Sequence, residues 1–202
     1  VLEGMETESC VGGGIFMSNS NLSAVRTDLR QNVADEQGGG ILADGAVDLT
    51  CVGIVGNEAA QGGGGIWARD GTLYLDHVVI AGNDAQTANG GGIGVDAAVG
   101  VTLVDGILFG NVAGSGGGVF ADASSTVSPS YTDAWGNGPS DYDGMTDPVG
   151  TNGNVSVDPS FLDTTGLDHA RWDLHLQATS ALIDGGDPGA TDPAGPPSAT
   201  GI

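Results

Sequence analysis

A triplet of glycines returns five times along the chain at nearly constant spacing, and this repeat constrains the fold more than any other feature. The triplets occupy 12–14, 38–40, 63–65, 90–92 and 116–118, so successive copies are 26, 25, 27 and 26 residues apart. Each triplet is followed by a β-branched residue and each unit is closed by an asparagine: Ile15, Ile41, Ile66, Ile93 and Val119, then Asn32, Asn57, Asn83, Asn111 and Asn137. Two landmarks that keep one period over five copies are typical of a solenoid, whose units bury their apolar sides against one another.

Between these landmarks apolar and polar residues alternate, which is the pattern of β-strands. Counted back from the asparagines, the tenth and eighth residues are apolar in four coils: Leu22, Val47, Leu73 and Val101, then Ala24, Leu49, Leu75 and Leu103. The residues between them are mostly polar: Ser23, Asp48, Tyr74 and Thr102. A third apolar column stands three residues before the asparagines: Leu29, Ile54, Ile80 and Leu108. No stretch keeps a 3.6-residue apolar period, so very little helix is expected.

We therefore predict an all-β chain that forms a right-handed parallel β-helix of about five to seven coils of roughly 26 residues, with an irregular C-terminal cap. Residues 1–137 would form the coils, and 138–202 would add a loop, the final coils and the cap of the same domain, including a strand over 172–176. Each triglycine would occupy a corner that needs positive φ and close backbone approach. The asparagines, stacked in register, would bond to one another as an amide ladder.

The charge is strongly one-sided, with 26 Asp and Glu against 4 Lys and Arg and a formal net charge of −22. Such a chain repels nucleic acid and anionic membranes, so neither is expected as a partner. No apolar run approaches the roughly 18 residues needed to cross a membrane, so we expect no membrane insertion by this segment. The chain opens with Val1-Leu2-Glu3-Gly4 and lacks a basic leader. We expect it to be part of a longer chain or assembly.

The repeat also carries a family resemblance. Over 12–137, a Gly-Gly-Gly-Ile motif is paired with an aliphatic-x-x-Asn motif, as in 80–83. This pairing resembles the repeat of bacterial polymorphic outer-membrane and autotransporter-type β-helices. In those proteins the second motif often begins with Phe. The runs 158–161, 173–176 and 180–186 are similar to the end of bacterial secreted β-helix proteins of the choice-of-anchor type, from which Ala181 and Leu182 depart. The resemblance implies an extracellular or cell-surface location and no particular reaction.

An aspartate column follows the glycine triplets and is the candidate metal site: Asp44, Asp70, Asp96 and Asp122. Stacked carboxylates repel unless a cation or water separates them, and clustered oxygen ligands suit calcium. Calcium is thus the cofactor that this column would take. In the alternative interpretation each aspartate bonds the backbone of its own turn, as aspartate commonly does.

A second candidate column stands directly after the β-branched residues and is the candidate ligand-binding stripe: Phe16, Leu42, Trp67 and Phe120. If the β-branched residues point inward, this column points outward and could stack on sugar rings or pack on a partner. The alternative is that a loop or another part of the protein covers it.

A third column, six residues before each asparagine, contains reactive side chains in consecutive coils: Arg26, Cys51, His77 and Asp105. Neighbours in such a column lie about 5 Å apart. They suggest a nucleophile, base and orienting group, or metal ligands, while chance occupants of a variable surface column are the simpler interpretation. Cys10 and Cys51 are placed on different faces, which disfavours a disulfide between them.

Short, uniform loops leave few walls for a catalytic cleft, and we assign no catalytic residue. The sequence favours a non-enzymatic secreted or cell-surface β-helix that acts as a structural stalk, an adhesin or a matrix- or glycan-binding module. Its partner would be a polysaccharide or a surface protein. The alternative is a carbohydrate-active hydrolase or lyase that uses surface aspartates such as Asp76 and Asp105. Residues 169–175, with two histidines and a tryptophan, are expected mainly to pack in the cap.

Overall fold

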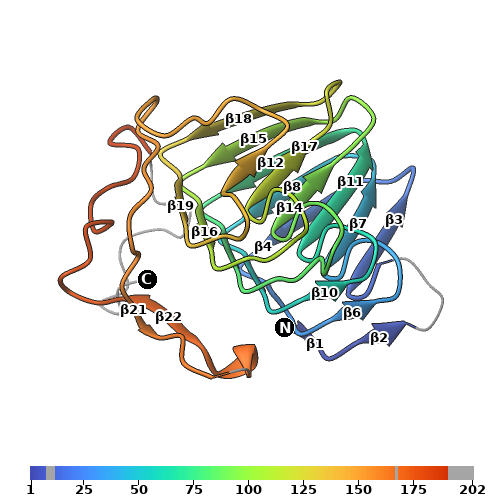
Figure 1. Ribbon diagram of the computed structural model, residues 1–202, viewed down its shortest axis with the longest axis horizontal. Coiled ribbons are helices and arrows are strands. Elements are labelled where there is room, and N and C mark those ends of the chain that lie inside the picture. Colours follow the sequence, from blue (N-terminus) through green and yellow to red (C-terminus); the bar gives the residue numbers. More distant parts are fainter. Residues whose placement is uncertain (8–11, 167, 191–202) are drawn as a thin grey trace.

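The chain winds into a parallel β-solenoid of about five turns, seen in the computed structural model as stacked strands that follow one another along the axis (Figure 1). The structure describes residues 1–7, 12–166 and 168–190. Within those ranges the helical content is a single 3₁₀ turn, η1 (His169–Arg171). The prediction of an all-β parallel solenoid is confirmed, at the lower end of the expected number of coils.

Three parallel sheets run the length of the solenoid, and each coil contributes one strand to each sheet. The strand after the triglycine builds the first face: β3 (Ile15–Ser18), β7 (Ile41–Asp44), β11 (Ile66–Asp70), β14 (Ile93–Val95), β17 (Val119–Ala121) and β20 (Tyr142–Asp143). The next strand builds the second face: β4 (Leu22–Val25), β8 (Val47–Thr50), β12 (Thr72–Asp76), β15 (Gly100–Val104) and β18 (Thr126–Ser130). The strand before the asparagine builds the third face: β1 (Leu2–Glu3), β5 (Asp28–Arg30), β9 (Gly53–Val55), β13 (Val79–Ala81), β16 (Ile107–Phe109) and β19 (Asp133–Trp135). A short fourth ladder follows the asparagines, with β2 (Glu6–Thr7), β6 (Val33–Ala34) and β10 (Glu58–Ala59).

The apolar columns identified in the sequence form continuous rows through the interior. Ile66 pairs with Ile41 on one side and Ile93 on the other, and all three are fully buried. Leu75 lies in register with Leu49 and is fully buried in the same core. Each coil therefore closes the apolar side of its neighbour, which is the reason why a repeat of this length folds only as a stack.

The triglycines form the corner before the first face, where neighbouring coils approach too closely for a side chain. A Cβ on Gly39 would lie 2.4 Å from the carbonyl oxygens of both Glu58 and Gly64. The first glycine of the triplet also takes positive φ, as Gly38 does at 72°. Glycine is thus required at this corner both by contact with the next coil and by backbone conformation.

The asparagines form the expected ladder. The Nδ2 atoms of Asn57 and Asn83 each donate to the Oδ1 atom of the next asparagine at 2.9 Å, and each also donates to a backbone carbonyl one coil back. The ladder runs without interruption from Asn32 to Asn137. At its upper end Asp141 accepts the last donor at 2.7 Å. Because these amides are buried, complete pairing is what makes them tolerable in the core.

Residues after the fifth coil first close the open end and then turn back along the side. Met145 packs against the core, and Val155 bridges to Asp133 of β19. The chain then forms an antiparallel hairpin of β21 (Phe161–Asp163) and β22 (Asp173–Leu176), beside the stack in Figure 1. The expectation that 172–176 adds a strand is confirmed, but the strand pairs within the hairpin and not as a further coil.

The hairpin packs on the corner between the third face and the asparagine ladder. His169 and Trp172 stack edge to face with ring centroids 4.3 Å apart. They lie over Gly56 and Gly82, where an added Cβ would meet them at 2.5 and 2.8 Å. The packing role expected for this part of the chain is thus found at His169 and Trp172, on the side of the solenoid.

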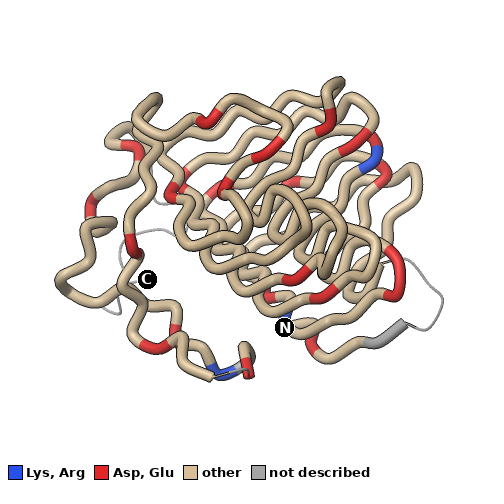
Figure 2. Tube along the Cα trace, in the orientation of Figure 1, with Lys and Arg blue, Asp and Glu red and all other residues tan. Residues whose placement is uncertain are grey.

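Acidic residues are spread along the whole trace and the few basic residues are scattered (Figure 2). Among the described residues, no helix is long and apolar enough to cross a membrane. Cys10 lies outside the described residues, as does the part of the tail from 191 to 202. The expectation about a Cys10–Cys51 pair therefore stays a prediction.

Candidate functional site

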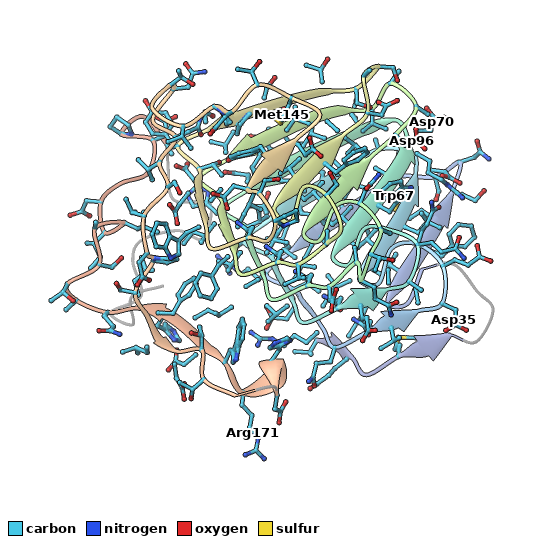
Figure 3. The ribbon with its side chains drawn as sticks, in the orientation of Figure 1. Asp35, Trp67, Asp70, Asp96, Met145 and Arg171 are labelled. Atoms are coloured by element: carbon cyan, nitrogen blue, oxygen red, sulfur yellow. The ribbon has the colours of Figure 1, made fainter. Side chains whose placement is uncertain are left out.

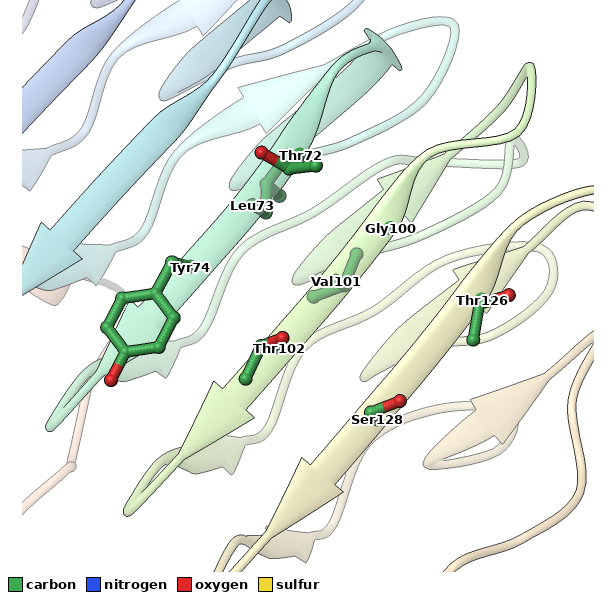
Figure 4. Close-up of a pocket in the computed structure, with 8 residues that line it drawn as sticks. All are labelled: Thr72, Leu73, Tyr74, Gly100, Val101, Thr102, Thr126 and Ser128. Atoms are coloured by element: carbon green, nitrogen blue, oxygen red, sulfur yellow. The ribbon is translucent and has the colours of Figure 1, made fainter.

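The second face carries a shallow hollow of about 330 Å³ (Figure 4). Its position follows from the strand register, which aligns Thr72, Gly100 and Thr126 in one outward row and Tyr74, Thr102 and Ser128 in the next. Gly100 lacks a side chain between two threonines, and a Cβ built there would meet nothing closer than 3.9 Å. The missing side chain is what opens the hollow.

The lining is uncharged and rich in hydroxyls. Tyr74 is 45% exposed and lies in register with Thr102 of the next strand, and its ring extends along β12 (Figure 4). Within the described part of the chain, the hydroxyls of Thr72, Thr102 and Ser128 make no hydrogen bond to another protein group. Each can therefore both donate to and accept from a ligand. A flat ring beside free hydroxyls is the combination that recognises a sugar, which offers an apolar ring face and many hydroxyls of its own.

The predicted aromatic stripe on the first face is aligned as expected but is largely covered. Phe16, Leu42 and Trp67 lie in one row, and Phe120 continues it after Gly94. Phe16 is 51% exposed, whereas Leu42 is fully buried and Trp67 is 5% exposed. Trp67 lies against two glycines, where an added Cβ on Gly94 would fall inside its ring and one on Gly62 would approach to 2.8 Å. Exposure along the row is thus restricted mainly to its first member.

Each aspartate of the predicted metal column accepts hydrogen bonds from protein groups in the structure, and calcium binding by the column stays a prediction. Asp70 and Asp96 accept from the next residue's backbone N–H at 2.7 and 2.8 Å, at the turns labelled in Figure 3. Asp122 accepts from the hydroxyl of Ser124 at 2.7 Å.

Asp44 binds Arg69 through two hydrogen bonds of 2.8 and 2.7 Å, which hold the pKa of Asp44 below its usual value. Within the described ranges, the residues of this column form no group of three metal-ligating atoms.

The column of Arg26, Cys51, His77 and Asp105 lies at the corner between the second and third faces, where each residue takes positive φ of 51 to 55°. The structure brings His77 and Asp105 together and adds Asp76. The Nδ1 atom of His77 lies 2.7 Å from Asp76 Oδ1, and its Nε2 atom lies 3.8 Å from Asp105 Oδ2. Across the described residues, these three form the one group of histidine, cysteine and acidic side chains whose ligand atoms are close enough to hold an ion.

The two sites differ in how the sequence signals them. The corner group could be anticipated, because two of its members stand at equivalent positions of consecutive coils. The hollow was not predicted, because a glycine at an outward strand position is not distinctive in a glycine-rich chain. The available signal was Gly100 aligned between Thr72 and Thr126, one residue before the apolar column.

The fold and the surface define the chain as an acidic parallel β-solenoid with a hydroxyl-lined hollow on one lateral face. In comparisons with known proteins, no family model matches the chain, and neither a curated protein nor a solved structure shows significant similarity to it.

Proposed function

We propose that this chain is a non-enzymatic module of a secreted or cell-surface protein, and that its second face binds a neutral polysaccharide. The observation that carries the proposal is the hollow around Gly100, where an exposed tyrosine shares a row with hydroxyls that have no hydrogen-bond partner among the described residues. In this role the solenoid is a rigid scaffold that presents a binding strip along its side.

The geometry of the strip supports an extended ligand over a small one. Its rows run along the solenoid axis with the interstrand spacing of about 4.8 Å, so successive hydroxyls lie at regular intervals. A polymer of sugars offers hydroxyls along its length and can engage several rows at once. The absence of deep walls matches a ligand that lies along the surface.

The charge supports a neutral ligand over an anionic one. At a formal net charge of −22, the protein repels polyanions such as polygalacturonate or alginate at long range. The lining of the hollow contains no cation that would offset this repulsion. A neutral glycan meets no such barrier.

The proposed location has support from the repeat. The Gly-Gly-Gly-Ile and aliphatic-x-x-Asn motifs resemble those of bacterial surface-displayed β-helices, and these motifs form the triglycine corner and the buried ladder of the described coils. Such a scaffold suits a stalk or an adhesin, because its length grows by adding coils without changing the face that it presents.

The alternative, a carbohydrate-active hydrolase or lyase, has less support. A glycosidase needs two carboxyl groups that both reach the scissile bond. Asp76 accepts a hydrogen bond from His77, and the side chain of Asp105 is only 6% exposed. Neither carboxylate is free to approach a sugar lying on the second face.

Binding can be measured by isothermal titration calorimetry with soluble neutral polysaccharides, such as xyloglucan, dextran and mannan, and with polygalacturonate as the anionic counterpart. We expect saturable binding of at least one neutral polymer and none of the anionic one. Tyr74→Ala should weaken binding about two- to tenfold, since an aromatic contact contributes about 0.5–1.5 kcal/mol. Gly100→Val should abolish it by filling the hollow.

Two controls separate this strip from the other exposed aromatic positions. Trp135→Ala removes an aromatic side chain of the third face that is 40% exposed, and Phe16→Ala removes the exposed member of the first-face row. Both should leave the affinity unchanged. Equal loss from these variants and from Tyr74→Ala would rule out the second face as the binding site. Shortened products after incubation with the panel would instead establish the enzymatic alternative.

A further inference from the structure

The corner between the second and third faces joins a histidine of one coil to an aspartate of the next. His77 follows β12 directly, and Asp105 follows β15, which lies beside it in the sheet. Both residues occupy the left-handed turn position, with φ of 53 and 51°. The stacked turns therefore present the two side chains to each other across one interstrand step.

The hydrogen bond on one side of the imidazole fixes what the other side offers. A carboxylate can only accept, so the Nδ1 atom of His77 carries the proton that it donates to Asp76 at 2.7 Å. The neutral ring then has its lone pair on Nε2, the atom that faces Asp105. A carboxylate behind a histidine in this way is the usual arrangement that orients a metal-ligating imidazole.

The facing oxygen of Asp105 is buried. The side chain of Asp105 is 6% exposed, and its Oδ2 atom has no hydrogen-bond partner among the residues that the structure describes. Its other oxygen accepts the backbone N–H of Asp187 at 2.7 Å, which fixes the carboxylate from the side of the C-terminal segment. A buried carboxylate oxygen without a partner is costly, so it calls for a ligand.

From this geometry we infer that His77 Nε2 and Asp105 Oδ2 bind a divalent transition-metal ion of the zinc class, with Asp76 as the positioning residue behind the histidine. The two ligand atoms lie 3.8 Å apart, too far for a hydrogen bond. Zinc bonds to nitrogen and oxygen of about 2.0–2.2 Å place such ligands roughly 3.4 Å apart at a tetrahedral angle, so a small side-chain adjustment suffices. The imidazole nitrogen favours zinc or copper over calcium or magnesium, which prefer oxygen ligands only.

The ion would connect three parts of the chain. His77 and Asp105 belong to consecutive coils, and Asp105 is bonded to the segment that returns along the solenoid at Asp187. Waters complete the coordination shell on the exposed side, where His77 is 34% exposed. The site lies at the corner beyond β12 and does not include the hollow, so it stands independently of the glycan-binding proposal.

The test is calorimetric titration of the EDTA-treated chain with ZnCl₂ at pH 7.5, in 0.15 M salt with excess Mg²⁺ to occupy the dispersed surface carboxylates. We expect one saturable zinc site per chain and a higher melting temperature with zinc. Asp105→Asn should lose the site while retaining an acceptor for the Asp187 N–H. Asp76→Asn should weaken zinc binding about 10–100-fold, as removal of an outer hydrogen-bond partner typically does.

A matched control is present in the same chain. His175 and Asp173 make the same Nδ1–Oδ1 contact at 2.6 Å, but they are exposed and belong to no group of three ligands among the described residues. His175→Gln should leave zinc binding unchanged, whereas His77→Asn, which suits the left-handed turn, should remove it. Zinc binding that survives both His77→Asn and Asp105→Asn, or the absence of a saturable site in the unaltered chain, would overturn the inference.

Discussion

Removing one asparagine from the middle of the ladder should destabilise this fold strongly. The side chain of Asn83 takes part in four hydrogen bonds of 2.9 Å. Its amide donates to Ile54 O and Asn111 Oδ1, and its oxygen accepts from the side chain and the backbone N–H of Asn57. Asn83→Ala removes all four. It leaves two donors of Asn57 unpaired in a part of the core with no exposed surface.

The magnitude follows from those orphaned groups. Each buried donor left without a partner costs about 1–3 kcal/mol, so two of them predict a loss of roughly 2–6 kcal/mol. A domain of this kind has about 5–15 kcal/mol of stability in total, so the variant should be severely destabilised. Asn83→Asp should be at least as damaging, because its carboxylate would face the oxygens of Ile54 and Asn111 with no donor to offer.

The assay is urea unfolding followed by far-ultraviolet circular dichroism, with Asn21→Ala as the control. Asn21 is exposed and should change stability by less than about 0.5 kcal/mol. The midpoint of the Asn83→Ala curve should fall far below that of the control, with a similar slope. If Asn83→Ala lowered the free energy of unfolding by less than about 1 kcal/mol, the ladder would not be a principal stabilising element and the reasoning would be refuted.

Two further perturbations test the corner glycines and the buried carboxylate of β19. A Cβ on Gly64 would lie 2.6 to 2.7 Å from the backbone of Asp84. Gly64→Ala should therefore lower the melting temperature markedly, at a cost of about 1–3 kcal/mol or more. The control Gly100→Ala should be neutral, because the space around Gly100 is open. Equal melting temperatures for the two variants would contradict the close approach of the coils. Burial raises the pKa of Asp133 to about 7, so its contribution to stability should fall as pH rises from about 4 through 7, by roughly 4 kcal/mol in all. Asp133→Asn keeps an acceptor for the Val157 N–H. In urea titrations, its free energy of unfolding should exceed that of the parent by a margin that grows as pH rises above 4. The same difference in free energy of unfolding at pH 4 and pH 8 would refute this.

The fold could be predicted from the sequence because its determinants are local and periodic. Ile41, Ile66 and Ile93 stand at equal distances from a triglycine, and in a stack equal distances place them in one row. The asparagine ladder follows from the same logic, since a buried amide can be satisfied at every coil only by its own copies above and below.

The exposure and contacts of the surface side chains were harder to predict, because they depend on what covers each outward row. Trp67 occupies an outward position but lies against Gly62 and Gly94, whose missing side chains make room for its ring. Asp44 stands in the aspartate column but is bonded to Arg69, beside an irregularity in the pairing of β11 with β7. Neither contact follows from the period of the repeat.

The pairing and docking of the C-terminal segment could not be predicted, for a different reason. Strand β22 alternates like the strands of the coils, but it has no equivalent in the repeat that would fix its partner. Its pairing with β21, and the docking of Trp172 over Gly82, depend on contacts between residues far apart in the chain.

The most direct test of the stacked register is an NMR measurement of couplings across individual hydrogen bonds. The amides of Ile41 and Ile66 donate to the carbonyls of Gly65 and Gly92 at 2.9 Å, one coil away in each case. Through-bond couplings should therefore connect these nitrogen–carbonyl pairs, and both amides should exchange slowly with solvent. Couplings displaced by one residue, or free exchange of both amides, would contradict the stack on which every placement of a side chain here depends.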